Sequence, residues 1–194
     1  MSIFIVLEGI DGSGKSTVTR HIASEFQNVY STREPTGCAA GRLAKRIAHE
    51  NTSPYYDLFL YLADRVHHTR KIQNILENGR DVICDRYWGS TAAYQAAKSE
   101  IQLNYLVDIQ EPFVLRPDLT LLFDIDPEMS LKRIQTRDET SKYERLEFLQ
   151  NVRENYLTLA KDHGWEIINA HENIEDVCSE VKKIIKKVKG FRGF

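Results

Sequence analysis

Short, mostly apolar runs alternate with longer segments of helical period along the whole chain. The runs at residues 3–7, 28–32, 81–85, 119–123 and 165–168 have the length and composition of strands. Strands that alternate with helices in this way form parallel sheets with helices on both faces. The pattern therefore predicts an α/β fold with a five-stranded parallel sheet.

Helices are predicted between these strands, and their ends carry ordinary helix signals. The helical segments span residues 15–26, 39–49, 54–78, 91–98, a further segment ending near 109, 127–135, 145–163 and 174–188. Pro54 follows the candidate caps Thr52 and Ser53, while Gly79 and Gly164 stand just after helix ends. The polar stretch 137–142 separates two helical patterns and is predicted to be a mobile loop.

Polar side chains stand at the ends of the predicted strands. Glu8, Arg33, Asp85, Arg86 and Asp124 each end or directly follow an apolar run. Ligands of open parallel sheets bind at the carboxyl ends of the strands. These residues therefore mark the edge of the sheet where a site is expected.

Composition narrows the class of protein. The 194 residues are 42% hydrophobic with a net charge of −2, which suits one domain, 1–194, and argues against a protein that coats nucleic acid. The cysteines, Cys38, Cys84 and Cys178, are too far apart for a disulfide framework or a CxxC metal site, which indicates a reducing compartment. With no signal peptide and no apolar run long enough for a bilayer, the protein is expected to be cytoplasmic.

A phosphate-binding loop gives the first chemical signal. Residues 9–16 fit G-x-x-x-x-G-K-S/T, between a predicted strand and a predicted helix. Glycines let backbone N–H groups turn toward an anion, and the helix N-terminus adds positive potential. Lys15 is predicted to reach the β- and γ-phosphates of ATP, and Ser16 to bind Mg²⁺. The predicted ATP-phosphate contacts are Gly9, Ile10, Asp11, Gly12, Ser13, Gly14, Lys15, Ser16 and Thr17.

Such a loop occurs in switch GTPases, in motor ATPases and in kinases of small molecules. The chain has no guanine-reading N/T-K-x-D element after a later strand, and it is shorter than most motor ATPases. Cations at several strand ends suit a second, phosphorylated substrate. A small-molecule phosphotransferase is therefore favoured.

Five ordered segments resemble the thymidylate kinase family. They are the phosphate-binding loop with its flanks at 4–17, the T-R-E-P element at 32–35, the L-F-x-A-x-R helix at 58–65, the D-R-Y segment with its later A-Y-Q at 85–95, and the P-D-L strand at 117–124. The resemblance implies a P-loop NTPase fold with a short lid near 133–144. It also implies transfer of the γ-phosphate of ATP to dTMP with Mg²⁺, giving dTDP, in a homodimer formed through helices. The net charge and the lack of a bilayer-spanning apolar run predict no nucleic-acid or membrane partner.

The resemblance assigns roles at the acceptor side. The counterpart of Asp11 contacts the sugar 3′-hydroxyl, Tyr61 replaces a base-stacking Phe, and Arg65 is placed to contact a base carbonyl. Tyr94 matches an aromatic residue that packs against the sugar and disfavours a 2′-hydroxyl. The predicted dTMP-binding residues are Asp11, Arg33, Tyr61, Arg65, Arg86, Thr91, Tyr94 and Gln95.

Charge neutralisation is the main catalytic requirement of phosphoryl transfer. Asp85 is placed like a Walker-B carboxylate, acting on Mg²⁺ directly or through water, and Arg86 suits bidentate contact with the acceptor phosphate. In the family a catalytic arginine comes from the phosphate-binding loop or from the lid. Gly12 stands at the loop position, so the lid is favoured. The predicted catalytic residues are Lys15, Asp11, Arg86, Arg133 and Arg137, with Ser16 and Asp85 for metal.

Some points stay open at this stage. The sequence does not choose between Arg133 and Arg137, nor between Lys45 and Arg46 as the counterpart of a later acceptor-side arginine, because the family's G-G-T appears as Thr36-Gly37-Cys38. The rival functions are a kinase with another nucleotide or nucleoside acceptor, and a nucleotide-dependent switch with no acceptor.

Overall fold

The five predicted strands form one parallel sheet. A computed structural model describes residues 2–48, 50, 52–134 and 140–188. The sheet has the order β2-β3-β1-β4-β5, and every neighbouring pair is parallel. The strands are β1 (Phe4–Glu8), β2 (Val29–Arg33), β3 (Asp81–Asp85), β4 (Leu119–Asp124) and β5 (Glu166–Asn169). The predicted fold class is therefore confirmed.

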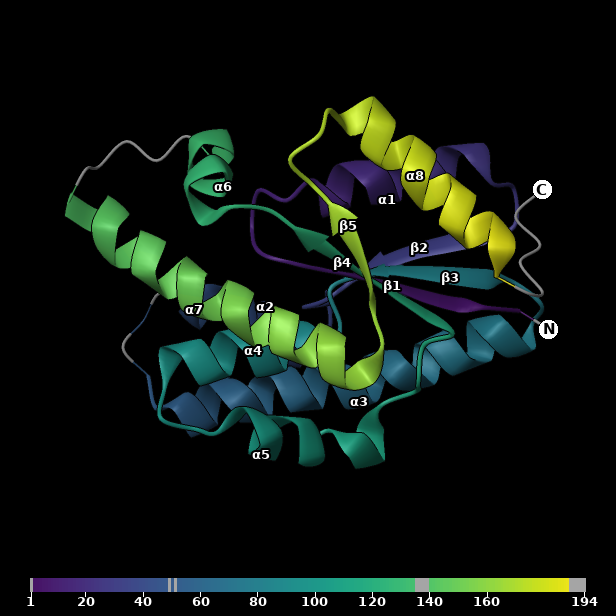
Figure 1. The fold of residues 1–194 in the computed structure, drawn as a ribbon. Coiled ribbons are helices and arrows are strands. Elements are labelled where there is room, and N and C mark those ends of the chain that lie inside the picture. The colour runs from purple at the N-terminus through teal and green to yellow at the C-terminus, as the bar shows by residue number, and fades with distance from the viewer. Residues whose placement is uncertain (1, 49, 51, 135–139, 189–194) are drawn as a thin grey trace.

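Helices cover both faces of the sheet, as Figure 1 shows. One face carries α1 (Lys15–Glu25) and α8 (Ile174–Lys187), which pack together; the other carries α3 (Pro54–Glu77), α4 (Trp88–Lys98), α5 (Leu103–Asp108) and α7 (Thr140–His163). Outside these layers, α2 (Ala39–Ile47) packs on α3 and α6 (Pro127–Ile134) packs on α7, while the 3-10 turn η1 (Glu111–Phe113) contacts α3. Two helical layers thus enclose the sheet.

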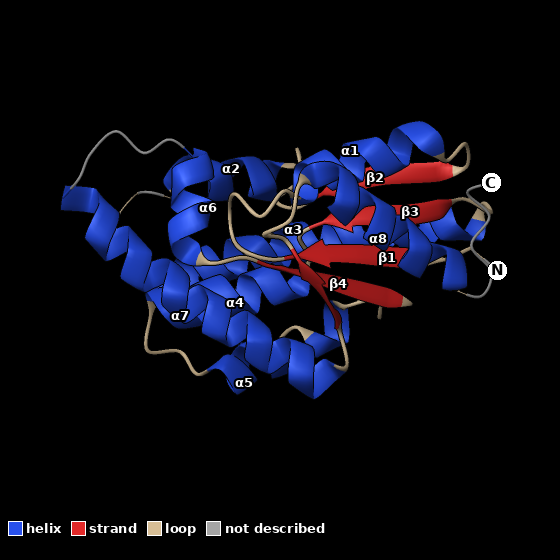
Figure 2. Ribbon diagram, turned by 45° about the horizontal axis from the view of Figure 1, so that its top comes forward, coloured by secondary structure: helices blue, strands red, loops and turns tan. Residues whose placement is uncertain are grey.

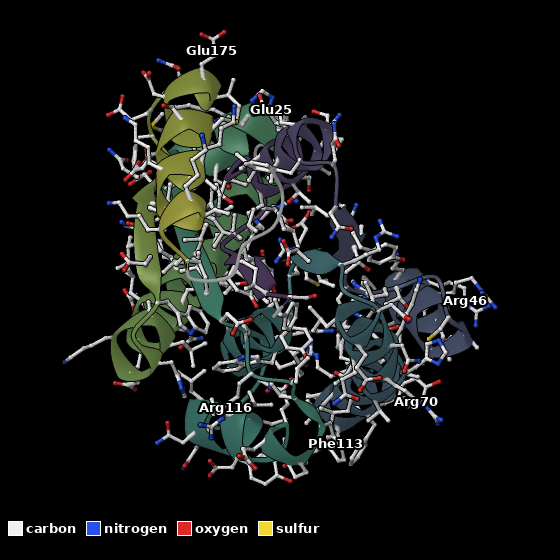
Figure 3. All side chains as sticks on the ribbon, turned by 90° about the vertical axis from the view of Figure 1, so that its right-hand side faces the viewer. Glu25, Arg46, Arg70, Phe113, Arg116 and Glu175 are labelled. Carbon is white, nitrogen blue, oxygen red and sulfur yellow. The ribbon has the colours of Figure 1, made fainter. Side chains whose placement is uncertain are left out.

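The burial of each strand explains its composition. Figure 2 shows β3 and β1 lying between β2 and β4. Every residue of β1 and β3 is buried, whereas the edge strands β2 and β5 are partly exposed. Central parallel strands are covered on both faces and therefore read as continuous apolar runs. Charged side chains such as Glu25, Arg46, Arg70, Arg116 and Glu175 extend outward in Figure 3. In the described part of the chain, no helix is long and apolar enough to cross a membrane.

Two predicted helix starts, those of α4 and α7, shift by three residues or more. Helix α4 begins at Trp88, three residues earlier than predicted, because the buried Glu8 carboxylate accepts hydrogen bonds from the N–H groups of Tyr87 and Ser90. Helix α7 begins at Thr140, so residues 140–142 are helical and not loop. The rest of that predicted loop, 137–139, lies outside the described residues.

The strand register brings the predicted site residues to one edge. Leu7 lies beside Asp85, and Asp85 lies beside Arg33, so the carboxyl ends of three strands meet there. Asp124 ends β4 at the same edge, and its carboxylate pairs with Arg153, whose Nε lies 2.6 Å from Oδ1. This edge carries the cavities described next.

Candidate active site

The phosphate-binding loop connects β1 to α1 in the predicted place. Gly9, Gly12 and Gly14 have φ of 140°, 75° and 90°, a region that side chains rarely adopt. A Cβ on Gly9 would also lie 2.6 Å from the Phe123 carbonyl oxygen. Glycine is therefore required for the loop to turn and to lie against β4.

Lys15 is buried at the start of α1, and its ammonium group bonds back to the phosphate-binding loop. Its Nζ donates to the Ile10 carbonyl at 2.7 Å and to Ser13 Oγ at 3.0 Å. Burial, reinforced by the Arg86 charge, lowers the pKa of Lys15 to about 7, although Asp85, Asp11 and Glu8 oppose the shift. A bound polyphosphate would give the Lys15 ammonium an anionic partner and would favour its charged form.

A cavity of 630 Å³ opens at the loop. It is lined by residues 11–17 of the predicted set, and also by Arg33, Arg86 and Arg133. Gly9 and Ile10, at the start of the loop, do not line it, and Ile10 is buried in the core. The far wall comes from residues that sequence reasoning missed: Ala170, Glu172, Asn173, Ile174 and Val177. We call this space the loop cavity.

Arg133 joins two walls of the loop cavity. Its Nη1 donates to the Ala170 carbonyl at 3.1 Å and approaches the Gly12 carbonyl at 3.5 Å. Arg133 therefore lies at the phosphate-binding loop. The alternative, Arg137, lies outside the described residues.

Ser16 and Asp85 meet beside the loop. Ser16 Oγ donates to Asp85 Oδ2 at 2.5 Å. Among the described residues, the other oxygen of this buried carboxylate, Oδ1, has no hydrogen-bond partner. A buried carboxylate oxygen without a partner beside a hydroxyl suits a hydrated cation.

A second cavity of 520 Å³ lies between α3 and α4. Asp57, Tyr61 and Arg65 line it from α3 at intervals of one turn, and Thr91, Gln95 and Lys98 line it from α4. The helices are antiparallel across it, because Arg65 Nη2 bonds Thr91 Oγ1 at 3.2 Å while Lys98 bonds Asp57 at the other end. We call this space the acceptor cavity.

The predicted acceptor-side residues divide between the two cavities. Asp11, Tyr61, Arg65, Arg86, Thr91, Tyr94 and Gln95 all line the acceptor cavity. Arg33 is exposed at the end of β2 and lines the loop cavity instead. Lys45 and Arg46 line neither; Lys45 Nζ lies 3.3 Å from the Thr36 carbonyl oxygen.

Gln95 presents an unused acceptor. Its side chain is buried, and Oε1 has no partner among the described residues. A buried amide oxygen without a hydrogen bond is unfavourable by ~1–3 kcal/mol. A ligand that donates a hydrogen bond in the acceptor cavity would remove that penalty.

Arg86 and Asp11 stand where the two cavities meet. Both residues line both cavities, and Arg86 Nη2 lies 2.7 Å from Asp11 Oδ1. The Tyr94 hydroxyl accepts from Arg86 at 3.2 Å and from the Asp11 N–H at 3.1 Å. Partial burial opposes ionisation of Asp11, but the Arg86 and Lys15 charges lower its pKa overall. An anion reaching this point from either cavity meets a fixed guanidinium.

Arg86 is held by its backbone as well as by its partners. It has φ of 70°, the one positive φ of a non-glycine residue in the described chain. Its N–H donates to the Leu7 carbonyl at 2.9 Å, and its Nη1 donates to Ser90 Oγ at 3.2 Å. Strained backbone of this kind persists only where the surroundings enforce it, and it gathers at functional sites.

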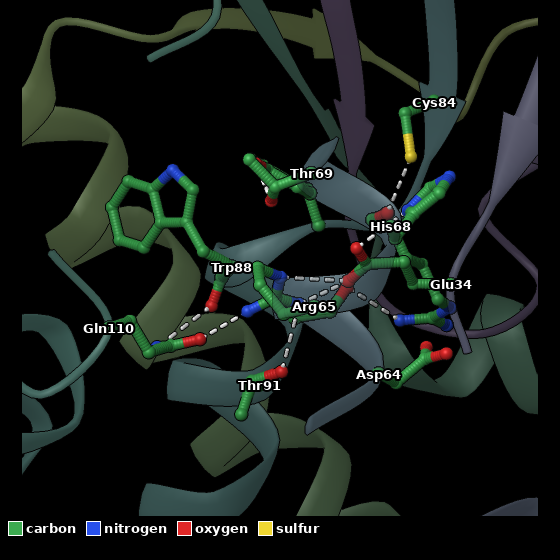
Figure 4. A network of polar contacts seen from close by, with 12 residues as sticks. Glu34, Asp64, Arg65, His68, Thr69, Cys84, Trp88, Thr91 and Gln110 are labelled. Carbon is green, nitrogen blue, oxygen red and sulfur yellow. Dashed lines mark hydrogen bonds and ion pairs between the residues drawn. The ribbon is translucent and has the colours of Figure 1, made fainter. Parts of the chain in front are cut away.

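The Arg65 guanidinium is buried in a network that Figure 4 shows. Its Nε donates to Glu34 Oε2 at 2.9 Å, and Nη2 donates to the same oxygen. Burial opposes the charge, but the Glu34 carboxylate raises the pKa of Arg65 overall. Glu34 also contacts His68, whose Nδ1 lies 2.8 Å from Oε1. The sequence placed Glu34 only in the T-R-E-P element and did not reveal this anchor, because the anchor depends on contacts across more than 30 residues.

These features define a class of protein: a P-loop nucleotide-binding fold with a second, cation-bearing cavity beside the phosphate loop. Within that class, the model of the family described as thymidylate kinase matches residues 7–181. The chain belongs to the thymidylate kinase family of phosphotransferases, which confirms the resemblance in the sequence.

Known relatives match nearly the whole length of the chain. A protein named "Probable thymidylate kinase" from Pyrobaculum calidifontis is 42% identical over 95% of this chain and 96% of its own. Another of that name from Pyrococcus horikoshii is 40% identical, over 94% and 95%. The crystal structure of thymidylate kinase from Ehrlichia chaffeensis has a TM-score of 0.76 at 28% identity, covering 95% of this chain and 98% of that one.

Proposed function

We propose that this protein transfers the γ-phosphate of ATP to dTMP, giving dTDP and ADP. The observation that carries the proposal is the junction of the two cavities at Asp11 and Arg86. A donor phosphate at Lys15 and an acceptor phosphate at Arg86 would approach each other across this junction. Phosphoryl transfer needs such an approach and charge neutralisation, with no covalent step on the protein.

Each acceptor-side residue takes a role that its position supports. Tyr61 offers an aromatic face to a base, Arg65 and Thr91 offer polar groups at the buried end, and Gln95 Oε1 accepts from a base N–H. Asp11 and Tyr94 lie near the phosphate end, where a sugar would sit. Arg33, which lines the loop cavity, adds positive charge on the donor side.

The residues at the loop fit Mg²⁺. Ser16 and the unpartnered Oδ1 of Asp85 would hold the ion, Asp85 directly or through water. When bound, Mg²⁺ neutralises charge on the β- and γ-phosphates. In the described part of the chain no group of three or more His, Cys, Asp or Glu could hold a metal, so we expect phosphate oxygens to complete the site.

Arg133, which lines the loop cavity, is a candidate for the cation that the lid supplies to the transferred phosphoryl group. We propose that Arg133 or Arg137 neutralises the transferred phosphoryl group, since Gly12 leaves the loop without an arginine. Replacing the catalytic one by Ala should lower kcat by about a hundredfold or more. If neither Arg133→Ala nor Arg137→Ala lowers kcat to that extent, the proposed lid cation is wrong.

A homodimer is supported by one face of α3. Tyr55, Phe59 and Val66 lie within about 40° of one another around this helix, and their exposed fractions are 51%, 57% and 48%. Three large apolar side chains exposed on one helix face favour burial against a partner. We propose that a second copy of this chain covers them.

The first experiment is ADP formation from Mg-ATP with dTMP, dUMP, UMP, dCMP, dGMP, AMP and thymidine. The proposal expects strong preference for dTMP and a loss of about a hundredfold or more in kcat/KM for Arg86→Ala. Arg116→Ala is the matched control, because that side chain is 87% exposed on the surface. Preference for another monophosphate would reject the thymine assignment, and tight ATP binding without acceptor-dependent turnover would favour a nucleotide switch.

A further inference from the structure

Gln110 is a fully buried amide that sequence reasoning did not single out. It stands between α5 and η1 and is 1% exposed. Its Oε1 accepts a hydrogen bond from Arg65 Nη1 across 45 residues of sequence. Its Nε2 donates to the Leu106 carbonyl at 2.6 Å and approaches the Trp88 carbonyl at 3.3 Å (Figure 4). The amide thus joins α5, α4 and the Arg65 side chain.

These contacts allow one orientation of the carboxamide. If the group were turned by 180°, its oxygen would face two carbonyl oxygens and its NH₂ would face the donors of Arg65. Both ends of the amide would then lose their hydrogen bonds in a buried place. Gln110 is therefore a fixed acceptor for the guanidinium.

The guanidinium has few donors left for a ligand. Of its five N–H bonds, one from Nε and one from Nη2 go to Glu34, one from Nη2 goes to Thr91, and one from Nη1 goes to Gln110. Its plane is also held over the Tyr87 ring, with Cζ 4.9 Å from the centroid. One Nη1 hydrogen remains. The guanidinium plane sets its direction, and Gln110 helps to hold that plane because it accepts the other hydrogen of the same nitrogen.

We infer that Gln110 is a positioning residue for base selection, acting through Arg65. This inference rests on the proposed function, in which Arg65 contacts the base of the acceptor. With one N–H in a fixed direction, the site favours a base that presents a carbonyl there. A base with an amino group would place two donors against each other.

Gln110→Met tests the inference, because it keeps the side-chain length and removes both polar groups. We expect KM for dTMP to rise about tenfold or more, while kcat and KM for ATP change less than about twofold. The preference for dTMP over dCMP should fall at the same time. Val107→Ala is the matched control: Val107 lies one turn away and packs against the core, and in the described part of the chain its side chain makes no hydrogen bond to Arg65. We expect it to lower stability without changing these ratios.

Measuring Gln110→Met in an Arg65→Lys variant separates a positioning role of Gln110 from a general loss of structure. In Arg65→Lys there is no Nη1 for Gln110 to hold, so adding Gln110→Met should change the dTMP dissociation constant by less than about twofold. An equal effect in both backgrounds would overturn the inference. If Gln110→Met does not fold, Gln110→Asn, whose amide is one methylene too short, is used in the same comparison.

The outcomes also separate this inference from the proposed function. If the unmodified protein does not phosphorylate dTMP, the proposed function fails and the inference fails with it. If it phosphorylates dTMP while Gln110→Met leaves the KM for dTMP and the dTMP-to-dCMP preference unchanged, only the inference fails.

Discussion

At the scale of single residues, the charged groups of this site are held by buried partners. Arg65 and Lys15 are 1% and 4% exposed, and each has its hydrogen-bonding atoms directed by neighbours. Removing a charge from water is unfavourable unless partners replace the lost hydration. The site therefore holds charged groups that a ligand can bind, and burying these groups is unfavourable to the stability of the fold unless their partners compensate.

The lowered pKa of Lys15 predicts pH-dependent ATP binding. In the free protein the pKa is about 7, and bound phosphates raise it, so binding takes up a proton above pH 7. The ATP dissociation constant should therefore rise between pH 7 and pH 9, by up to about tenfold per pH unit. Calorimetry over this range checks it. Lys15→Arg is the control, because arginine stays charged and its profile should be flat; a flat profile for the unmodified protein contradicts the prediction.

Glu34→Gln should remove the ion pair that holds the Arg65 guanidinium. The variant keeps the shape of the side chain but leaves the buried guanidinium without a carboxylate. We expect a loss of about 3 kcal/mol in the free energy of unfolding and a higher KM for dTMP. Urea unfolding measures the first and steady-state kinetics the second. As a control, Glu111→Gln removes a carboxylate that is 68% exposed in a surface ion pair and should change neither.

At the scale of elements, the acceptor cavity depends on how close α4 lies to the sheet. Glu8 on β1 accepts hydrogen bonds from the Ser90 N–H at 3.1 Å and from its hydroxyl at 2.5 Å. Tyr156 on α7 donates to the same carboxylate at 3.2 Å. Burial raises the pKa of Glu8, while the hydrogen bonds from Ser90 and from the Tyr87 N–H, together with the Arg86 charge, oppose the rise. One buried carboxylate thus places the helix that carries Thr91, Tyr94 and Gln95.

Gly89→Ala tests this close approach. A Cβ there would lie 2.4 Å from the Trp165 ring and 3.0 Å from Glu8 Oε1. We expect α4 to shift, with a loss of about 2 kcal/mol in stability and a raised KM for dTMP. Thermal unfolding and kinetics measure both. Gly37→Ala is the control, because nothing lies within 4 Å of its added Cβ; equal effects of the two changes would contradict the explanation.

At the scale of the whole molecule, the sheet sets the relation between the two cavities. The loop cavity opens after β1, and the acceptor cavity lies between helices that flank the same edge. Strand order puts β3, with Asp85, directly beside β1. The donor and acceptor residues therefore converge although the bonded pairs Ser16–Asp85 and Asp11–Arg86 are 69 and 75 residues apart.

The proposed dimer gives a prediction at this scale. Phe59→Glu places a charge in the centre of the exposed apolar face of α3 and should convert a dimer into a monomer. Sedimentation velocity measures the mass. Ile167→Glu, on the exposed side of β5, is the control with a similar exposed fraction, 51%, and should leave the mass unchanged. A dimer that persists in Phe59→Glu would place the interface elsewhere.

Much of the fold followed from local pattern. Apolar runs and helical spacing gave the strands and their order along the chain, because a doubly covered strand must be apolar throughout. Helix ends at Gly79 and Gly164 were predicted correctly, with φ of 80° and 65°. The earlier start of α4 was missed, because its first turn is held by Glu8, 79 residues or more away.

The sequence by itself determined the phosphate-binding loop and the family, because their signals lie in short segments whose backbone demands are local. Only the tertiary structure decided which residues hold the functional ones. Arg65 could be chosen from its helix motif, but Glu34, Gln110 and Thr91 reach it from three other segments. Buried polar groups must find partners wherever the chain brings them, and such partners leave no periodic signal in the sequence.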